Sequence, residues 1–124
     1  MKKKICALFF VFMMLSASVY CQYYAEGRAE AVYKGTTADR TLDELYDETL
    51  QIARSTGCRL STVSKLSKRA NRLLWKALDQ YDYAAGELYC VLIYEGAGAV
   101  ALLNLCVCIT ADGGCDWEGF YAVP

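Results

Sequence analysis

The sequence predicts an α+β domain, in which two antiparallel helices precede a three-stranded antiparallel β-meander, behind a cleaved signal peptide. Two stretches with apolar residues three and four positions apart indicate amphipathic helices. Two nearly continuous apolar runs after Gly86, bounded by glycine-rich segments, are typical of strands buried on both faces. A chain of 124 residues has room for one such domain.

The N-terminus has the layout of a secretory signal peptide. Lysines occupy positions 2–4, residues 5–15 are apolar without a break, and small residues follow at 16–18. A membrane-spanning helix is the weaker interpretation, because it needs about 20 apolar residues. We expect residues 1–18 to be removed, with the cut as late as residue 21, which predicts a secreted or periplasmic protein.

A lipid anchor on Cys21 is an alternative outcome of export. Bacterial lipoproteins carry a small residue before the modified cysteine, whereas this chain has Tyr20 there. Membrane contact is therefore expected only through the signal segment or through such an anchor. We expect residues 19–40 to form a partly ordered arm and residues 41–124 to form the single domain.

The first helix is expected to span Leu42–Ser55. Thr41 and Glu44 fit a capping box, in which each side chain accepts a hydrogen bond from the other residue's backbone amide. Gly57 stands where a left-handed residue ends a helix. The second helix is expected at 62–81, with Ser61 as its N-cap. The short connection between them favours antiparallel packing.

Three strands are expected after the helices, at 88–94, 100–109 and 117–123. The segments at 95–99 and 112–115 are glycine-rich and predict the two turns of a meander. Along a strand, alternate residues share a face. Asn104, Cys106 and Cys108 are therefore expected on one face, with Cys90 opposite Asn104 or Cys106.

Charge is nearly balanced in total and segregated along the chain. The chain has 13 Lys and Arg, 14 Asp and Glu and no His, for a net charge of −1. A basic face on the second helix contains Lys65, Lys68, Arg69, Arg72 and Lys76. We interpret it as a solvated face that complements the acidic first helix and the acidic C-terminal segment, with an anionic partner as the alternative. A nucleic-acid ligand is disfavoured by the overall balance.

The cysteines are expected to form disulfides, because exported proteins fold in oxidising compartments. The candidates are Cys21, Cys58, Cys90, Cys106, Cys108 and Cys115. The natural pairs are Cys90 with Cys106 and Cys108 with Cys115. The alternative is a site for a soft metal such as Cu(I) or zinc, formed by Cys90, Cys106, Cys108 and Cys115.

The function expected from these features is binding or assembly by a disulfide-stabilised envelope or extracellular protein. No enzyme is predicted, because the chain lacks His and has no catalytic motif, and no cofactor is predicted. Two helices on one side leave a sheet face uncovered, which predicts self-association or a protein partner through the sheet. The alternatives are an envelope binder of a soft metal or a small ligand on the cysteine-lined strand face, and a lipid-anchored lipoprotein.

Overall fold

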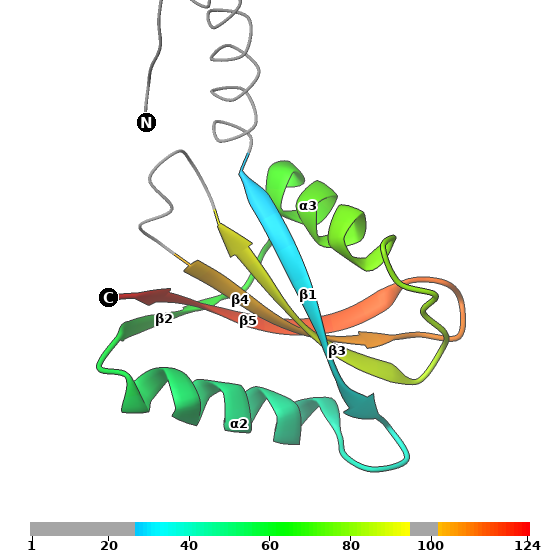
Figure 1. The fold of residues 1–124 in the computed structure, drawn as a ribbon, viewed down its shortest axis with the longest axis horizontal. Coiled ribbons are helices and arrows are strands. Elements are labelled where there is room, and N and C mark those ends of the chain that lie inside the picture. Colours follow the sequence, from blue (N-terminus) through cyan, green and yellow to red (C-terminus); the bar gives the residue numbers. More distant parts are fainter. Residues whose placement is uncertain (1–26, 95–101) are drawn as a thin grey trace, which may run out of the picture.

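The fold is a five-stranded antiparallel sheet with one helix on each face (Figure 1). The computed structural model describes residues 27–94 and 102–124. Along the chain the elements are β1 (Arg28–Thr36), α2 (Leu42–Ser55), β2 (Arg59–Val63), α3 (Lys68–Leu78), β3 (Glu87–Tyr94), β4 (Leu102–Ile109) and β5 (Cys115–Val123). The strands lie in the order β1-β3-β4-β5-β2, so β1 and β2 are the two edges.

The predicted fold class is wrong, because the sheet has two more strands than the expected meander. The meander itself forms the centre of the sheet, where β3 pairs with β4 and β4 with β5, all antiparallel. The turn expected at 112–115 lies between β4 and β5, where Gly113 has a φ of 89°. The expected turn at 95–99 and the signal segment lie outside the described residues.

The edge strand β1 comes from the segment that we assigned to a partly ordered arm. Val32 lies opposite Cys90, and Tyr33 lies opposite Tyr89, in an antiparallel pairing with β3. The side chains of Val32 and Tyr33 are 41% and 50% exposed. A half-exposed edge strand lacks the continuous apolar run that marks a buried strand, which is why its sequence pattern is weak.

The second helix is shorter than predicted at both ends. Residues 59–63 form β2, in which Thr62 pairs with Phe120 and Val63 with Gly119 of β5. Thr62 and Val63 are β-branched and favour a strand. The helix begins only after Ser67, whose hydroxyl accepts a hydrogen bond of 3.0 Å from the Ala70 amide.

The first helix, α2, is confirmed at Leu42–Ser55. Thr41 and Glu44 form the capping box: the Glu44 amide donates to the Thr41 hydroxyl at 3.2 Å, and the Thr41 amide donates to the Glu44 carboxylate at 3.0 Å. Gly57, with a φ of 80°, follows the C-cap. These signals are local, so the sequence alone places this helix.

The two helices lie on opposite faces of the sheet, which corrects the expected antiparallel neighbours (Figure 1). The chain passes from edge strand β1 through α2 to the other edge strand β2, and returns through α3 to β3. The connection from β1 to β2 contains α2, and the connection from β2 to β3 contains α3. Each of these two connections crosses a different face of the sheet. The core under α3 includes Tyr89, Val91, Leu105 and Val107, and the core under α2 is built on Leu45, Leu88, Cys90 and Cys106.

The expectation that a partner covers a bare sheet face assumes that both helices lie on one side. That assumption is wrong, since each face carries a helix (Figure 1). Self-association or partner binding through the sheet stays a prediction, without this reason to support it. Among the described helices, none is both long enough and apolar enough to cross a membrane.

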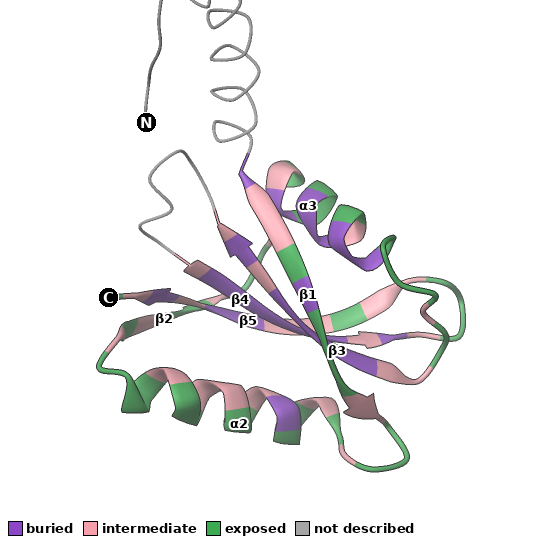
Figure 2. Ribbon diagram, in the orientation of Figure 1, coloured by how far each residue is buried: buried purple, intermediate pink, exposed green. Residues whose placement is uncertain are grey.

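The helices cover their faces unequally. In α3 the side chains of five residues are buried, namely Ala70, Leu73, Leu74, Ala77 and Leu78. In α2 only Leu45 is buried, and most of the helix is exposed or half-exposed (Figure 2). The sheet under α2 is therefore less tightly covered than the sheet under α3.

Candidate functional site

A groove lies between the C-terminal half of α2 and the sheet, with a volume of about 310 Å³. We call it the α2 groove. Most of its surface is apolar, and it is open to solvent along one side. Its lining comes from the helix and the segment after it, and from four of the strands: Val32, Lys34, Thr49, Ile52, Ala53, Thr56, Cys58, Cys90, Leu92, Leu102, Asn104 and Ala122.

The groove forms because α2 is anchored at its N-terminal half. Leu45 is fully buried there, and the Tyr46 ring meets Phe120 edge-on with centroids 5.8 Å apart. Further along the helix, Ile52 remains 54% exposed although it lines the groove. Ala53 and Ala122 are small, so the helix and the sheet do not fill the space between them.

Asn104 is the polar residue in the otherwise buried centre of the sheet. It lies on β4 opposite Leu92 and Phe120, lines the groove and is only 6% exposed. Within the described parts of the chain, its side-chain amide has no hydrogen bond to a protein group, and no side-chain nitrogen or oxygen there is both fully buried and unpaired, so solvent in the groove reaches this amide. Water in the groove can therefore occupy the hydrogen-bonding positions of this amide. This amide is therefore able to form hydrogen bonds with a molecule in the groove.

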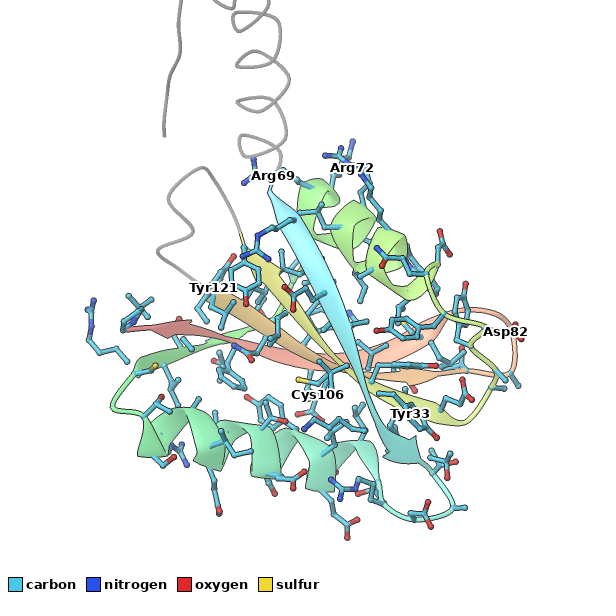
Figure 3. The ribbon with its side chains drawn as sticks, viewed as in Figure 1. Tyr33, Arg69, Arg72, Asp82, Cys106 and Tyr121 are labelled. Atoms are coloured by element: carbon cyan, nitrogen blue, oxygen red, sulfur yellow. The ribbon has the colours of Figure 1, made fainter. Side chains whose placement is uncertain are left out.

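Two thiols and a hydroxyl, those of Cys90, Cys106 and Thr49, meet beside the groove. Cys106 donates a hydrogen bond of 3.5 Å to the Thr49 hydroxyl of α2, which itself donates to the Leu45 carbonyl at 2.8 Å. Figure 3 shows Cys106 on the α2 side of the sheet. Cys90 lies directly opposite Cys106 and lines the groove together with Thr49 and Lys34.

The surroundings make the two thiols chemically unequal. The neighbouring Cys106 thiol lowers the pKa of the Cys90 thiol, and Thr49 and the charge of Lys34 lower it further, against the effects of burial and of the charge of Glu48. The Cys90 thiol and burial raise the pKa of the Cys106 thiol. Cys90 is also the one of the two that lines the groove, so it is the thiol that a reagent in the groove meets.

The expected cysteine register is confirmed for Cys90, which lies opposite Cys106 rather than Asn104. The described cysteines are all free thiols in the structure. Cys108 lies on the α2 side, whereas Cys115 packs against the core under α3, so the suggested partners Cys108 and Cys115 face opposite sides of the sheet. Within residues 27–94 and 102–124, no cluster suited to a metal ion forms. Cys21 lies outside these ranges.

Cys58 follows α2 and lines the groove, with its sulfur 3.1 Å from the Thr56 hydroxyl. It lies far from Cys115 although β2 and β5 are neighbours, because Arg59 pairs with Val123 at the other end of β5. Disulfide formation by these thiols stays a prediction. The structure brings Cys58 and Cys90 to one groove, and it brings Cys106 to Cys90.

The predicted basic face lies on and just before α3, on the side of the sheet away from α2 (Figure 3). Lys65, Lys68, Arg72 and Lys76 are exposed, while Arg69 is half-buried. The two ion pairs in the described ranges join Arg28 with Glu30 and Arg40 with Glu48. Neither connects the basic face to α2, so the expected intramolecular complement between the helices is wrong because the sheet lies between them.

Sequence reasoning missed most of the α2 groove. The expected arm at 19–40 contains Val32, and the helical pattern of Leu42–Ser55 does not indicate that Thr49, Ile52 and Ala53 line a groove. Asn104 did carry a signal, since it interrupts an uncharged apolar run on the face of the two thiols.

Comparisons of the chain with protein-family models, curated proteins and solved structures find no match. Function therefore has to be inferred from the groove itself. The relevant features are its apolar lining, the Asn104 amide and the Cys58 and Cys90 thiols that line it.

Proposed function

We propose that this chain is an exported small-ligand-binding protein, and that the α2 groove takes a compact apolar molecule carrying one polar group. The observation that carries the proposal is the Asn104 amide, which is buried at an apolar groove without a protein partner among the described residues. A ligand whose polar group hydrogen bonds to this amide can take the place of water there while its apolar part is removed from water. Export rests on the pattern of residues 1–18, which lie outside the described ranges.

The size and lining of the groove restrict the ligand. A volume of about 310 Å³ is at the lower end of the roughly 300–1,000 Å³ that ligand pockets span. When a ligand covers the apolar surface of Leu92, Leu102 and Ile52, each Å² removed from water contributes about 25 cal/mol to the free energy of binding. A short alkyl chain or a single ring with one polar group matches both features.

The charge at the groove favours one class of polar group. Lys34 lines the groove and lies close enough to Cys90 for its charge to lower that thiol's pKa. Among the described residues, no carboxylate lines the groove, although the charge of Glu48 also reaches Cys90 and opposes that of Lys34. A carboxylate on the ligand is therefore favoured over an ammonium group, and an uncharged amide suits Asn104 itself because each amide both donates and accepts hydrogen bonds.

Binding can be measured with three probes that share an alkyl chain: octanoate, octanamide and octylammonium. We expect chemical-shift changes in α2 and β4 with the first two probes and weaker binding of the third. Asn104→Leu keeps the side-chain volume but removes the hydrogen bonds, so it should raise Kd roughly 2- to 10-fold for octanamide.

The matched control is Asn71→Leu, which makes the same chemical change at an exposed position on α3. This variant should bind the probes like the parent chain. A folded Asn104→Leu protein with unchanged affinity for octanamide, or a folded parent chain that binds none of the three probes, would contradict the proposal.

A further inference from the structure

The two thiols under α2 lie in a geometry that allows a bond between them. Cys90 and Cys106 are directly opposite on the antiparallel strands β3 and β4 and face the same side. Residues opposite each other in such a pair have Cα atoms about 4.5–5.5 Å apart. Disulfides span Cα separations of about 4.4–6.8 Å, so the bridge can form without a change of strand register.

Such a bridge is reducible because its geometry is not ideal. Side chains opposite each other across two strands keep their Cβ atoms about 4.5–5.5 Å apart, whereas a disulfide needs about 3.8 Å. The strands must therefore approach each other when the bond forms. Strained disulfides are the ones that thiols reduce most easily.

Only one of the two thiols is open to a reagent. Cys90 lines the α2 groove, whereas Cys106 is fully buried and does not line it. Lys34 lies at the same groove and favours an anionic reagent. The lowered pKa of Cys90 supports the same assignment, since the thiolate is the attacking species.

We propose that Cys90 and Cys106 are a reversible dithiol–disulfide pair, in which Cys90 attacks small anionic disulfides that enter the α2 groove and Cys106 resolves the product. This activity does not depend on the ligand proposed above. A buried thiol pair beneath an apolar groove gives the groove a covalent reaction in addition to binding.

The steps balance with a small disulfide, RS–SR, as the oxidant. The Cys90 thiolate attacks one sulfur, the S–S bond of the reagent breaks, and one RS⁻ leaves with the proton that Cys90 has lost. Cys106 then attacks the Cys90 sulfur, its proton passes to the second departing RS⁻, and the Cys90–Cys106 bond forms. Two protein thiols are oxidised by two electrons, and one disulfide is reduced to two thiols.

The test uses the full-length chain and dithiobis-nitrobenzoate, an anionic aromatic disulfide whose released thiol is coloured. We expect this pair to release two equivalents of the coloured thiol per protein chain rapidly. Peptide mapping should then identify the Cys90–Cys106 bridge. Reduced glutathione should restore both thiols. In Cys106→Ser the reaction should stop at a stable mixed disulfide on Cys90, and Cys90→Ser should slow the reaction of Cys106 by at least about tenfold, because that thiol is buried.

The matched test of the groove is Lys34→Gln. We expect it to slow the reaction with dithiobis-nitrobenzoate roughly 2- to 5-fold and to slow the reaction with uncharged dithiodipyridine less, because the lost charge acts there only through the thiolate fraction of Cys90. If Cys106→Ser does not fold, the site of first attack in the parent chain can be mapped by quenching early. A first adduct on Cys106, thiols that stay unbridged in excess reagent, or a bridge that reduced glutathione does not open would overturn the proposal.

Discussion

Single residues in the centre of the sheet have roles that their residue type alone does not reveal. Asn104 is polar in a buried strand, and Gly119 is a glycine in one. Gly119 lies opposite Leu105 on β4 and opposite Val63 on β2. A Cβ atom added there would lie 2.9 Å from the Asn104 backbone oxygen and would collide with the Leu105 side chain. Close packing therefore requires glycine at this position.

Gly119→Ala should destabilise the protein, although alanine normally improves a strand. The added methyl group overpacks a buried site, which costs about 1–3 kcal/mol of unfolding free energy. Urea unfolding followed by circular dichroism measures the change. Gly114→Ala is the control, because its Cβ would meet only side-chain atoms at 3.4 Å and 3.5 Å. Equal stabilities of the two variants would show that β4 and β5 can move apart there.

At the scale of elements, α2 and α3 are held by different means. α3 buries five side chains in the larger core, whereas α2 buries one and is half-exposed elsewhere (Figure 2). The stability of α2 therefore depends more on its own capping and less on packing. The same weak packing leaves the groove open under its C-terminal half.

Thr41→Ala should loosen α2 measurably. It removes the hydroxyl that accepts from the Glu44 amide, which typically costs about 0.5–2 kcal/mol. We expect faster amide hydrogen exchange in the first turn of α2, together with lower global stability. Thr41→Ser keeps the hydroxyl and should behave like the parent chain. If both variants exchange at the parent rate, the cap does not limit the opening of α2.

At the scale of the whole molecule, charge is distributed across the sheet with α2 acidic and α3 basic. The start of α2 approaches β5, where Asp43 and Glu118 share a hydrogen bond. That hydrogen bond, burial and the charges of Asp43 and Asp47 raise the pKa of the Glu118 carboxyl. A folded-state pKa above the unfolded one stabilises the protein at low pH, and this contribution is lost as pH rises through the folded-state pKa.

Glu118→Gln should therefore raise the free energy of unfolding at neutral pH by a few tenths to about 1 kcal/mol. The reason is that it removes the repulsion between the Glu118 carboxylate on β5 and the Asp43 and Asp47 carboxylates on α2. The gain should shrink as the pH falls through the raised pKa of Glu118, and it should be gone below the ordinary pKa of Glu. Thermal unfolding across that pH range measures it. Asp116→Asn, at an exposed position of the same strand, is the control. A gain that is the same at acid and neutral pH would exclude repulsion as its cause.

The candidate site was only partly accessible to sequence reasoning. The facing positions of Cys90 and Cys106 follow from strand alternation and from the length of the β3–β4 connection. Asn104 is visible as an amide in an apolar run. The groove itself is not, because it depends on how far α2 stands from the sheet, and its lining joins Val32 to residues far along the chain.

The sequence by itself determined α2 with both its ends, the three strands of the meander and the alternation of their faces, because caps, turns and periodicity act over a few residues. Tertiary structure decided that Arg28–Thr36 and Arg59–Val63 are edge strands, and that the helices lie on opposite faces. An edge strand is stabilised by hydrogen bonds to a distant partner, β3 or β5 here, and no local pattern records that partner. The face that each helix covers follows from those edges.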